Sequence, residues 1–246
     1  MNMRLNTRMT DHGFTLIEVL LTMALSLVVL GGIYAVYTTQ QKSYMVQHQV
    51  VTMQQNVRAA MFIMSREIRM AGYDPTHIGG GALIPPAGIA TANIGELQFV
   101  ADLNSDGDTV DGPDNDTNEQ IRYHLTNDAD DDGVADGSPC DLGREIWGGG
   151  LQVLAENVDA LRFIYLDQNR IRLDDDGNGN VVASIPDIST VMLALVARTG
   201  WGDPLFTNSS VYQITLPDTT TEDVFTGPGD SFRRKLLTTE IRCRNL

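Results

Sequence analysis

Three short acidic stretches carry oxygen-bearing side chains at alternate positions, a spacing that can bind a cation. They read DLNSDGD at 102–108, DADDDGVAD at 128–136 and DDDGNGN at 174–180. Each follows the D-x-[DN]-x-[DN]-G pattern that opens a calcium loop. Calcium takes about 6–8 oxygen ligands, which alternate residues can supply, and the glycine permits the sharp turn. The candidate ligands are Asp102, Asn104, Asp106, Asp108, Asp128, Asp130, Asp132, Asp136, Asp174, Asp176, Asn178 and Asn180.

The second half of each stretch departs from the EF-hand pattern. The position of the usual bidentate glutamate holds Pro113, Pro139 and Ile185 in the three stretches, and no pair of helices flanks any of them. A looser site would have to use oxygens from nearby aspartates such as Asp114, Asp141 or Asp187. The alternative is that Asp, Asn and Gly simply form solvated turns. Both interpretations, calcium site and turn, remain open.

Other chemistry-bearing residues form no recognisable active site. The histidines His12, His48, His77 and His124 are scattered, and none makes a metal-binding pair at helical spacing. There is no G-x-S-x-G motif and no phosphate-binding loop after a strand. We therefore predict that the protein is not an enzyme.

Composition bounds the class of protein and its partners. The chain has 246 residues, 42% of them hydrophobic, which is enough to bury a sizeable core. Its formal net charge is −15, which disfavours binding to nucleic acid. The charge is local, because residues 102–141 hold 13 acids and one base, Arg122. Acidity is thus a property of short segments rather than of the whole surface.

The N-terminus contains an apolar run with one carboxylate inside it. Phe14 to Tyr37 is long enough to cross a bilayer as a helix of about 36 Å, yet it includes Glu18. The segment before it carries Arg4 and Arg8, which favours a cytoplasmic N-terminus. A secretory signal peptide is the alternative, but the run is too long, holds a charge and lacks a small-residue cleavage site. The run is therefore predicted to remain as an anchor.

The stretch GFTLIE at 13–18, with a basic leader before it and an apolar helix after it, resembles the class III signal of type IV prepilins and pseudopilins. This resemblance implies that a membrane peptidase cuts between Gly13 and Phe14 and methylates the new amino terminus. It also implies that Glu18 neutralises the amino terminus of a neighbouring subunit in the low dielectric of bundled anchors. The alternative is that Glu18 only reaches toward the nearby membrane interface.

The rest of the chain predicts one amphipathic helix followed by strands. Apolar residues recur at helical spacing from Val46 to Ile68, and Gly72 and Pro75 are expected to end the helix. Short, often alternating stretches then predict strands at 97–101, 119–125, 161–167, 169–173, 190–198, 211–216 and 233–245. The expected fold is α+β and pilin-like, with a long N-terminal helix on a mainly antiparallel sheet with long acidic loops.

Four further blocks narrow the resemblance to PilW-type minor pilins, with the J-type pseudopilins of type II secretion as relatives. They are REIRMAGYDP at 66–75, LAENVDALRFIYLD at 154–167, VMLALVARTG at 191–200 and FRRKLLTTEIRCRNL at 232–246. The resemblance implies a minor pilin that primes or caps a type IV pilus. It implies as partners other minor pilins, the major pilin, a tip adhesin, the prepilin peptidase and the inner-membrane assembly platform. The alternatives are a minor pseudopilin of type II secretion and a pilin-anchored, calcium-dependent surface adhesin.

This interpretation divides the chain into four parts and sets its compartment. We expect a leader at 1–13, a transmembrane helix at 14–37, an amphipathic continuation at 38–73 and a globular β-rich domain at 74–246. The protein would lie in the bacterial inner membrane with a cytoplasmic N-terminus and then move into the pilus, at its tip. Because the globular domain would be exported, Cys140 and Cys243 are predicted to form a disulfide.

Overall fold

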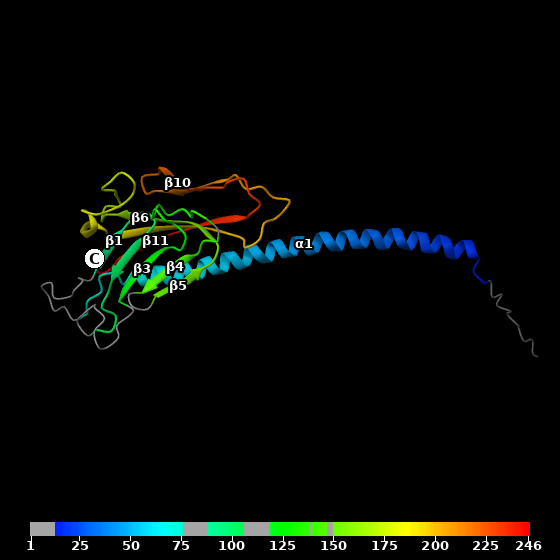
Figure 1. The fold of residues 1–246 in the computed structure, drawn as a ribbon, viewed down its shortest axis with the longest axis horizontal. Helices are drawn as coiled ribbons and strands as arrows, with labels where there is room; N and C mark the ends of the chain where they lie inside the picture. Colours follow the sequence, from blue (N-terminus) through cyan, green and yellow to red (C-terminus); the bar gives the residue numbers. More distant parts are fainter. Residues whose placement is uncertain (1–12, 76–87, 106–118, 138, 147–149) are drawn as a thin grey trace, which may run out of the picture. The chain divides into compact units, whose positions relative to one another are not determined.

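A computed structural model of the chain describes residues 13–75, 88–105, 119–137, 139–146 and 150–246. The leader residues 1–12 and the candidate ligands Asp106 and Asp108 lie outside this described part. The chain divides into two compact units, Met1–His48 and Gln49–Leu246. The helix α1 (Leu16–Ile68) contributes to both of them (Figure 1).

In the first unit α1 is apolar and exposed. It includes an 18-residue window with a mean hydropathy of 2.3, no residue of which is buried. Leu27, Val28 and Tyr34 are typical, with 70%, 75% and 69% of their surface exposed. By length and composition alone, this helix could cross a membrane.

In the second unit α1 is amphipathic. Its buried residues include Met53, Val57, Met61, Met64 and Ile68, which confirms the helical stripe predicted from the sequence. The helix ends at Ile68, five residues before the expected boundary. The helix ends early because the chain there bonds to the first sheet, where the Gly72 N–H donates to the Val100 carbonyl at 3.0 Å. Gly72 has φ +78°, and a Cβ there would lie 2.7 Å from the Asn245 carbonyl oxygen, so only glycine fits.

The strands of the second unit form two antiparallel sheets and a ribbon. The first sheet is a meander in the order β1 (Gly88–Ala92), β2 (Leu97–Val100), β3 (Gln120–Leu125), β4 (Leu142–Ile146) and β5 (Gly150–Ala155). The second sheet has the order β11 (Arg234–Arg242), β8 (Thr190–Arg198), β6 (Val158–Leu166) and β7 (Arg172–Leu173). The ribbon pairs β9 (Val211–Thr215) with β10 (Thr221–Thr226), and a 3₁₀ helix, η1 (Ile185–Asp187), precedes β8. The expected α+β architecture is confirmed.

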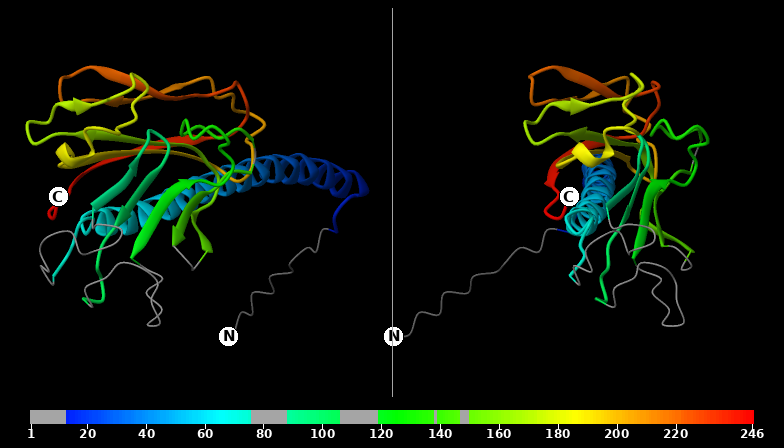
Figure 2. Two further views of the ribbon diagram at one scale, coloured as in Figure 1. Left: turned by 60° about the vertical axis from the view of Figure 1, so that its left-hand side comes forward. Right: turned by 90° about the vertical axis from the view of Figure 1, so that its left-hand side faces the viewer.

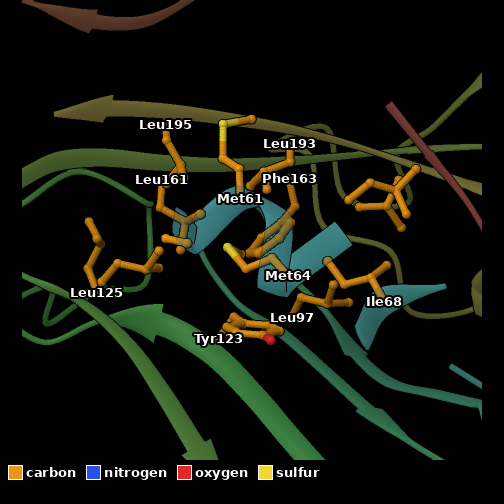
Figure 3. Close-up of a cluster of buried hydrophobic side chains, with 14 of the residues drawn as sticks. Met61, Met64, Ile68, Leu97, Tyr123, Leu125, Leu161, Phe163, Leu193 and Leu195 are labelled. Atoms are coloured by element: carbon orange, nitrogen blue, oxygen red, sulfur yellow. The ribbon is translucent and has the colours of Figure 1, made fainter. Parts of the chain in front are cut away.

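The main core lies between the apolar face of α1 and both sheets. Figure 3 shows Met61, Met64 and Ile68 of the helix among side chains of the two sheets. The sheet residues labelled there are Leu97, Tyr123, Leu125, Leu161, Phe163, Leu193 and Leu195, and all are buried. Burial of this area supplies the main force that holds the helix against the sheets.

A second, smaller core lies on the opposite face of the second sheet. There Ile164 of β6 and Val196 of β8 pack with Ile214 of β9 and Val224 of β10. Figure 2 shows the β9–β10 ribbon on the side of this sheet away from α1. Every residue of β8 is therefore buried, which explains why its sequence is a continuous apolar run rather than an alternating one.

A buried polar cluster ties α1 to the first sheet. The two Glu67 oxygens accept hydrogen bonds from Arg144 at 2.9 and 3.0 Å, and the Tyr123 hydroxyl also donates to Glu67. Tyr123 is fully buried, and burial, followed by the Glu67 charge, raises the pKa of its hydroxyl well above the usual value. The cluster therefore fixes the rotation and height of α1 against β3 and β4.

Candidate functional site

Gly13 and Phe14, the predicted processing residues, precede the first turn of α1. Thr15 occupies the N-cap position, since the helix starts at Leu16. The Glu18 N–H donates to the Thr15 hydroxyl oxygen, and the Thr15 N–H donates back to the Glu18 carboxylate, each at 3.4 Å. This reciprocal arrangement is a capping box. In the uncut chain Glu18 therefore has a partner at its own helix start.

Phe14 is accessible to the machinery that the motif implies. Its side chain is 84% exposed, and the peptide bond between Gly13 and Phe14 lies outside the hydrogen-bonded helix. Cleavage there would leave a new amino terminus four residues before Glu18, about one helical turn away. The geometry thus brings the predicted cleavage bond and the predicted assembly residue to one end of one helix.

In the described part of the acidic stretch that begins at Asp102, the carboxylates accept hydrogen bonds from the backbone. Asp102 is buried and accepts a hydrogen bond from the Ser105 N–H at 2.6 Å. Glu119, also buried, accepts from the Leu103 N–H at 2.8 Å and from the Asn104 N–H at 3.3 Å. These carboxylates hold the backbone at the start of this acidic stretch. Glu119 was not predicted from the sequence.

The stretch 128–136 brings three carboxylates together. One oxygen each of Asp128, Asp130 and Asp136 lies within 4.8 Å of the others. Asp132 is not part of this group, and its carboxylate accepts the Val134 N–H at 2.7 Å. The Asp128 Oδ1 atom is buried without a hydrogen-bond partner among the described residues. Burial, then the charge of Asp132, raises the pKa of Asp128 to about 6 against the opposing hydrogen bond from Gly133.

The loop backbone around these carboxylates is held by β6. Gly133 has φ +81°, and its carbonyl accepts the Leu161 N–H at 2.8 Å. A Cβ at position 133 would lie 2.1 Å from the Leu161 carbonyl oxygen, so a larger residue cannot keep this backbone path. The glycine that the calcium pattern requires is thus also required by the contact with the sheet.

The stretch 174–180 uses its acidic oxygens on its own backbone. Asp174 accepts hydrogen bonds from the Gly177 and Gly179 N–H groups at 2.7 and 3.0 Å. Asp176 accepts from the Asn178 and Asn180 N–H groups at 2.8 and 3.1 Å. These bonds, led by that from Asn178, lower the pKa of Asp176 to about 2. The candidate amide ligand Asn180 accepts the Ile94 N–H at 2.8 Å, which attaches the loop to the first sheet.

The two described loops face one another across a shared cavity of about 710 Å³. Its walls include Asp130 and Asp132 from one loop, Asp174 from the other, and the basic residues Arg162 and Arg172. Glu222 of β10 accepts from both arginines at 2.5 Å and ties the ribbon to the second sheet. This cluster was not predicted, because its members are distant in sequence and follow no motif.

The sequence matches two known protein families. Residues 8–34 match a family described as the prokaryotic N-terminal methylation motif. Residues 46–215 match the family described as prepilin peptidase-dependent protein B. The chain belongs to the prepilin peptidase-dependent protein B family. A type IV-like pilin from Thermus thermophilus is similar in structure, with 16% sequence identity and a TM-score of 0.47 over 78% of this chain and 97% of that chain. A search among curated proteins found no match.

Membership in this family confirms the resemblance predicted from GFTLIE and the later blocks. The protein is a type IV minor pilin-like, prepilin peptidase-dependent protein. Its apolar N-terminal helix and methylation motif fit membrane anchoring of a pilin. The roles of Gly13, Phe14 and Glu18 stay predictions.

The predicted disulfide is wrong for this structure, since Cys140 and Cys243 are both buried free thiols. Cys140 precedes β4 of the first sheet, and Cys243 follows β11 of the second, where its N–H donates to the Ser189 carbonyl at 2.9 Å. The Cys140 thiol instead donates to the Asn127 carbonyl at 3.8 Å. Each thiol is thus buried next to a different sheet.

Both thiols should therefore react only after unfolding. Burial raises the pKa of Cys140, and it raises that of Cys243 to about 11, so little reactive thiolate forms at neutral pH. We expect an alkylating reagent to label two cysteines in denatured, non-reduced protein and to label neither appreciably in folded protein within the same time. Intact-mass spectrometry measures the number of labelled cysteines. If the denatured protein is alkylated only after a reductant is added, the two cysteines do form a disulfide.

Proposed function

We propose that this protein is a minor pilin that primes or caps the assembly of a type IV pilus after cleavage between Gly13 and Phe14. The observation that carries the proposal is the start of α1, where an exposed Phe14 precedes a capped helix that holds Glu18 in its first turn. A cut there produces an anchor that can still be extracted from the membrane, because the helix continues directly into the globular unit. An assembled subunit needs this continuity.

The size of the β-rich unit supports the role of a minor pilin rather than of the repeating subunit. Two sheets pack against α1 in Gln49–Leu246, and a ribbon and acidic loops add to the size of this unit. Identical copies of such a unit would pack poorly along a slender filament, whereas a priming or capping position leaves one side free. As partners we propose other minor pilins, the major pilin and the assembly machinery of the inner membrane.

The test is mass analysis of the protein recovered from membranes and from sheared filaments. We expect a methylated Phe14 at the amino terminus, with the protein scarce relative to a smaller pilin in the filaments. Deletion of the gene should reduce the number of pili and leave the secretion of enzymes unchanged. An uncut Met1 terminus would overturn the proposed processing, and a secretion defect with normal piliation would favour a pseudopilin instead.

We further propose that the 128–136 loop binds calcium through Asp128, Asp130 and Asp136. The support is the mutual approach of their oxygens and the buried, unpartnered Asp128 Oδ1 among the described residues. A divalent cation would offset the repulsion of three carboxylates and supply the missing partner. The other two stretches are not included, because no three of their described carboxylates bring an oxygen within 4.8 Å of one another.

Isothermal titration of the full chain in detergent checks this proposal. We expect one calcium site with a dissociation constant of about 10⁻⁴–10⁻³ M, in the range of extracellular modules. The Asp130→Asn variant should lose the binding heat, while Asp187→Asn, which lies outside the cluster, should keep it. No heat and no thermal shift at millimolar calcium would leave the loop as a solvated turn.

A further inference from the structure

A groove of about 1220 Å³ lies beside the last part of α1, within the second unit. Residues of α1, β2, β3, β11 and the C-terminal tail line it. Its walls include Arg58, Phe62, Ile63, Arg66, Arg69 and Arg244. Arg58, Phe62 and Arg66 recur at helical spacing on the face of α1 that is turned away from the core, and Arg69 directly follows the end of the helix.

The groove gathers arginines that have no ion-pair partner within the described part of the chain. Eight described arginines lie within 4.0 Å of a carboxylate, namely Arg122, Arg144, Arg162, Arg170, Arg172, Arg198, Arg233 and Arg234. The other described arginines, Arg58, Arg66, Arg69, Arg242 and Arg244, form no ion pair with the part of the chain that the structure describes. All of these except Arg242 line the groove.

The described walls of the groove hold no carboxylate that is available to neutralise its arginines. Glu67 is the one carboxylate among the described lining residues, and both of its oxygens are bound by Arg144. The chain has a net charge of −15, so four arginines that are unpaired within its described part give the groove a charge opposite to that of the whole protein. It creates a potential that attracts acidic groups and repels basic ones.

The groove is also apolar enough to exclude water from a partner. Phe62 is 71% exposed, Ile63 is 37% exposed, and Met61 and Met70 lie along the same walls. Arginine, methionine and aromatic residues are the types enriched in protein interfaces, while lysine is depleted there. The planar guanidinium group suits two-point binding of a carboxylate. The combination indicates a protein partner with acidic and apolar side chains.

We infer that this groove is the docking site for an acidic, partly apolar segment of a neighbouring pilin chain. The inference rests on the proposed function, since it names the kind of subunit surface that assembly places against α1. Nucleic acid fits less well, because a long polyanion would also meet the acidic remainder of the surface. A second copy of this chain is the competing occupant, and the identity of the crosslinked peptide distinguishes the two.

Crosslinking in cells that assemble filaments tests the inference on the full chain. A photoreactive phenylalanine derivative replaces Phe62, and the crosslinked peptide is sequenced by mass spectrometry. We expect an acidic peptide from a different pilin. Val182, which is equally exposed at 71% but lies outside the groove, provides the matched control and should not yield that peptide.

Charge reversal supplies the second measurement. Arg66→Glu combined with Arg69→Glu should lower the Phe62-position crosslink at least tenfold, and changing acidic residues of the captured peptide to lysine should restore it. Neither arginine is paired within the described chain, so the thermal midpoint of the variant should stay close to that of the wild type. An unchanged crosslink yield would overturn the inference.

The remaining outcomes also decide between occupants. A crosslink to nucleic acid, to this chain itself, to a second copy or to a peptide without acidic residues would overturn the inference. Absence of the methylated protein from filaments would instead overturn the proposed function. Protein that is methylated and present in filaments, but never crosslinked to an acidic pilin segment, would remove only the docking site.

Discussion

Replacing Glu67 by alanine should lower the free energy of unfolding by about 3 kcal/mol. Arg144, which is buried, would lose both hydrogen bonds to its carboxylate partner and would remain as an unpaired charge. The buried Tyr123 hydroxyl would lose its acceptor as well. Because Glu67 is only partly exposed, little water can replace it, so both donors would be left poorly satisfied.

The measurement is thermal unfolding of the full chain in detergent, followed by near-ultraviolet circular dichroism. A loss of about 3 kcal/mol corresponds to a fall of about 6–12 °C in the midpoint for a domain of this size. Glu240→Ala is the matched control, because its ion pair with Arg170 is exposed on both sides, at 38% and 57%. That variant should change stability by less than about 1 kcal/mol. Equal midpoints for the two variants would show that the Glu67 cluster does not hold α1.

The long helix and most strands could be predicted because their patterns follow from burial. The stripe that includes Met53, Val57 and Met64 has helical spacing since only one face of α1 meets the sheets. The apolar run of β8 marked a strand covered on both faces. These features are local, and a single sequence contains them in full.

Four strands were missed. One of them, β5, reads GLQVLA and is exposed over most of its length, and the other three carry little of that signal. β1 reads GIATA, β4 reads LGREI and β10 reads TEDVFT, so glycine, small or charged residues interrupt the apolar pattern. Their place is set by pairing with neighbours, as when Arg144 of β4 lies opposite Tyr123 of β3. Such register depends on contacts between distant segments, and no local pattern records it.

The candidate sites divide in the same way. The helix start could be located because Gly13, Phe14 and Glu18 are adjacent in sequence and belong to one motif. The Arg162–Glu222–Arg172 cluster and the arginine-lined groove could not, because their residues come from separate elements. The disulfide prediction was wrong for a related reason. Export would make pairing chemically permissible, but it would not bring two strands of different sheets together.

Replacing Glu18 by glutamine should nearly abolish incorporation into filaments while leaving cleavage and methylation of Phe14 intact. Glutamine can occupy the third position of a capping box, so it preserves the reciprocal bonds with Thr15 and the start of α1. It cannot, however, neutralise the amino terminus of a neighbouring subunit. The variant therefore removes the charge of Glu18 and keeps its capping role, whereas Glu18→Ala would remove both.

Thr15→Ala is the complementary variant, because it removes the N-cap side chain and keeps the carboxylate. It should weaken the first turn of α1 by about 1 kcal/mol and still allow substantial incorporation. Quantitative immunoblots of sheared filaments, normalised to processed protein in the membrane, measure both effects. If Glu18→Gln enters filaments as well as the wild type and Thr15→Ala does not, the carboxylate acts through the helix cap alone. If instead Glu18→Gln fails and Thr15→Ala succeeds, the capping box of the uncut chain holds Glu18 only until cleavage creates its charged partner.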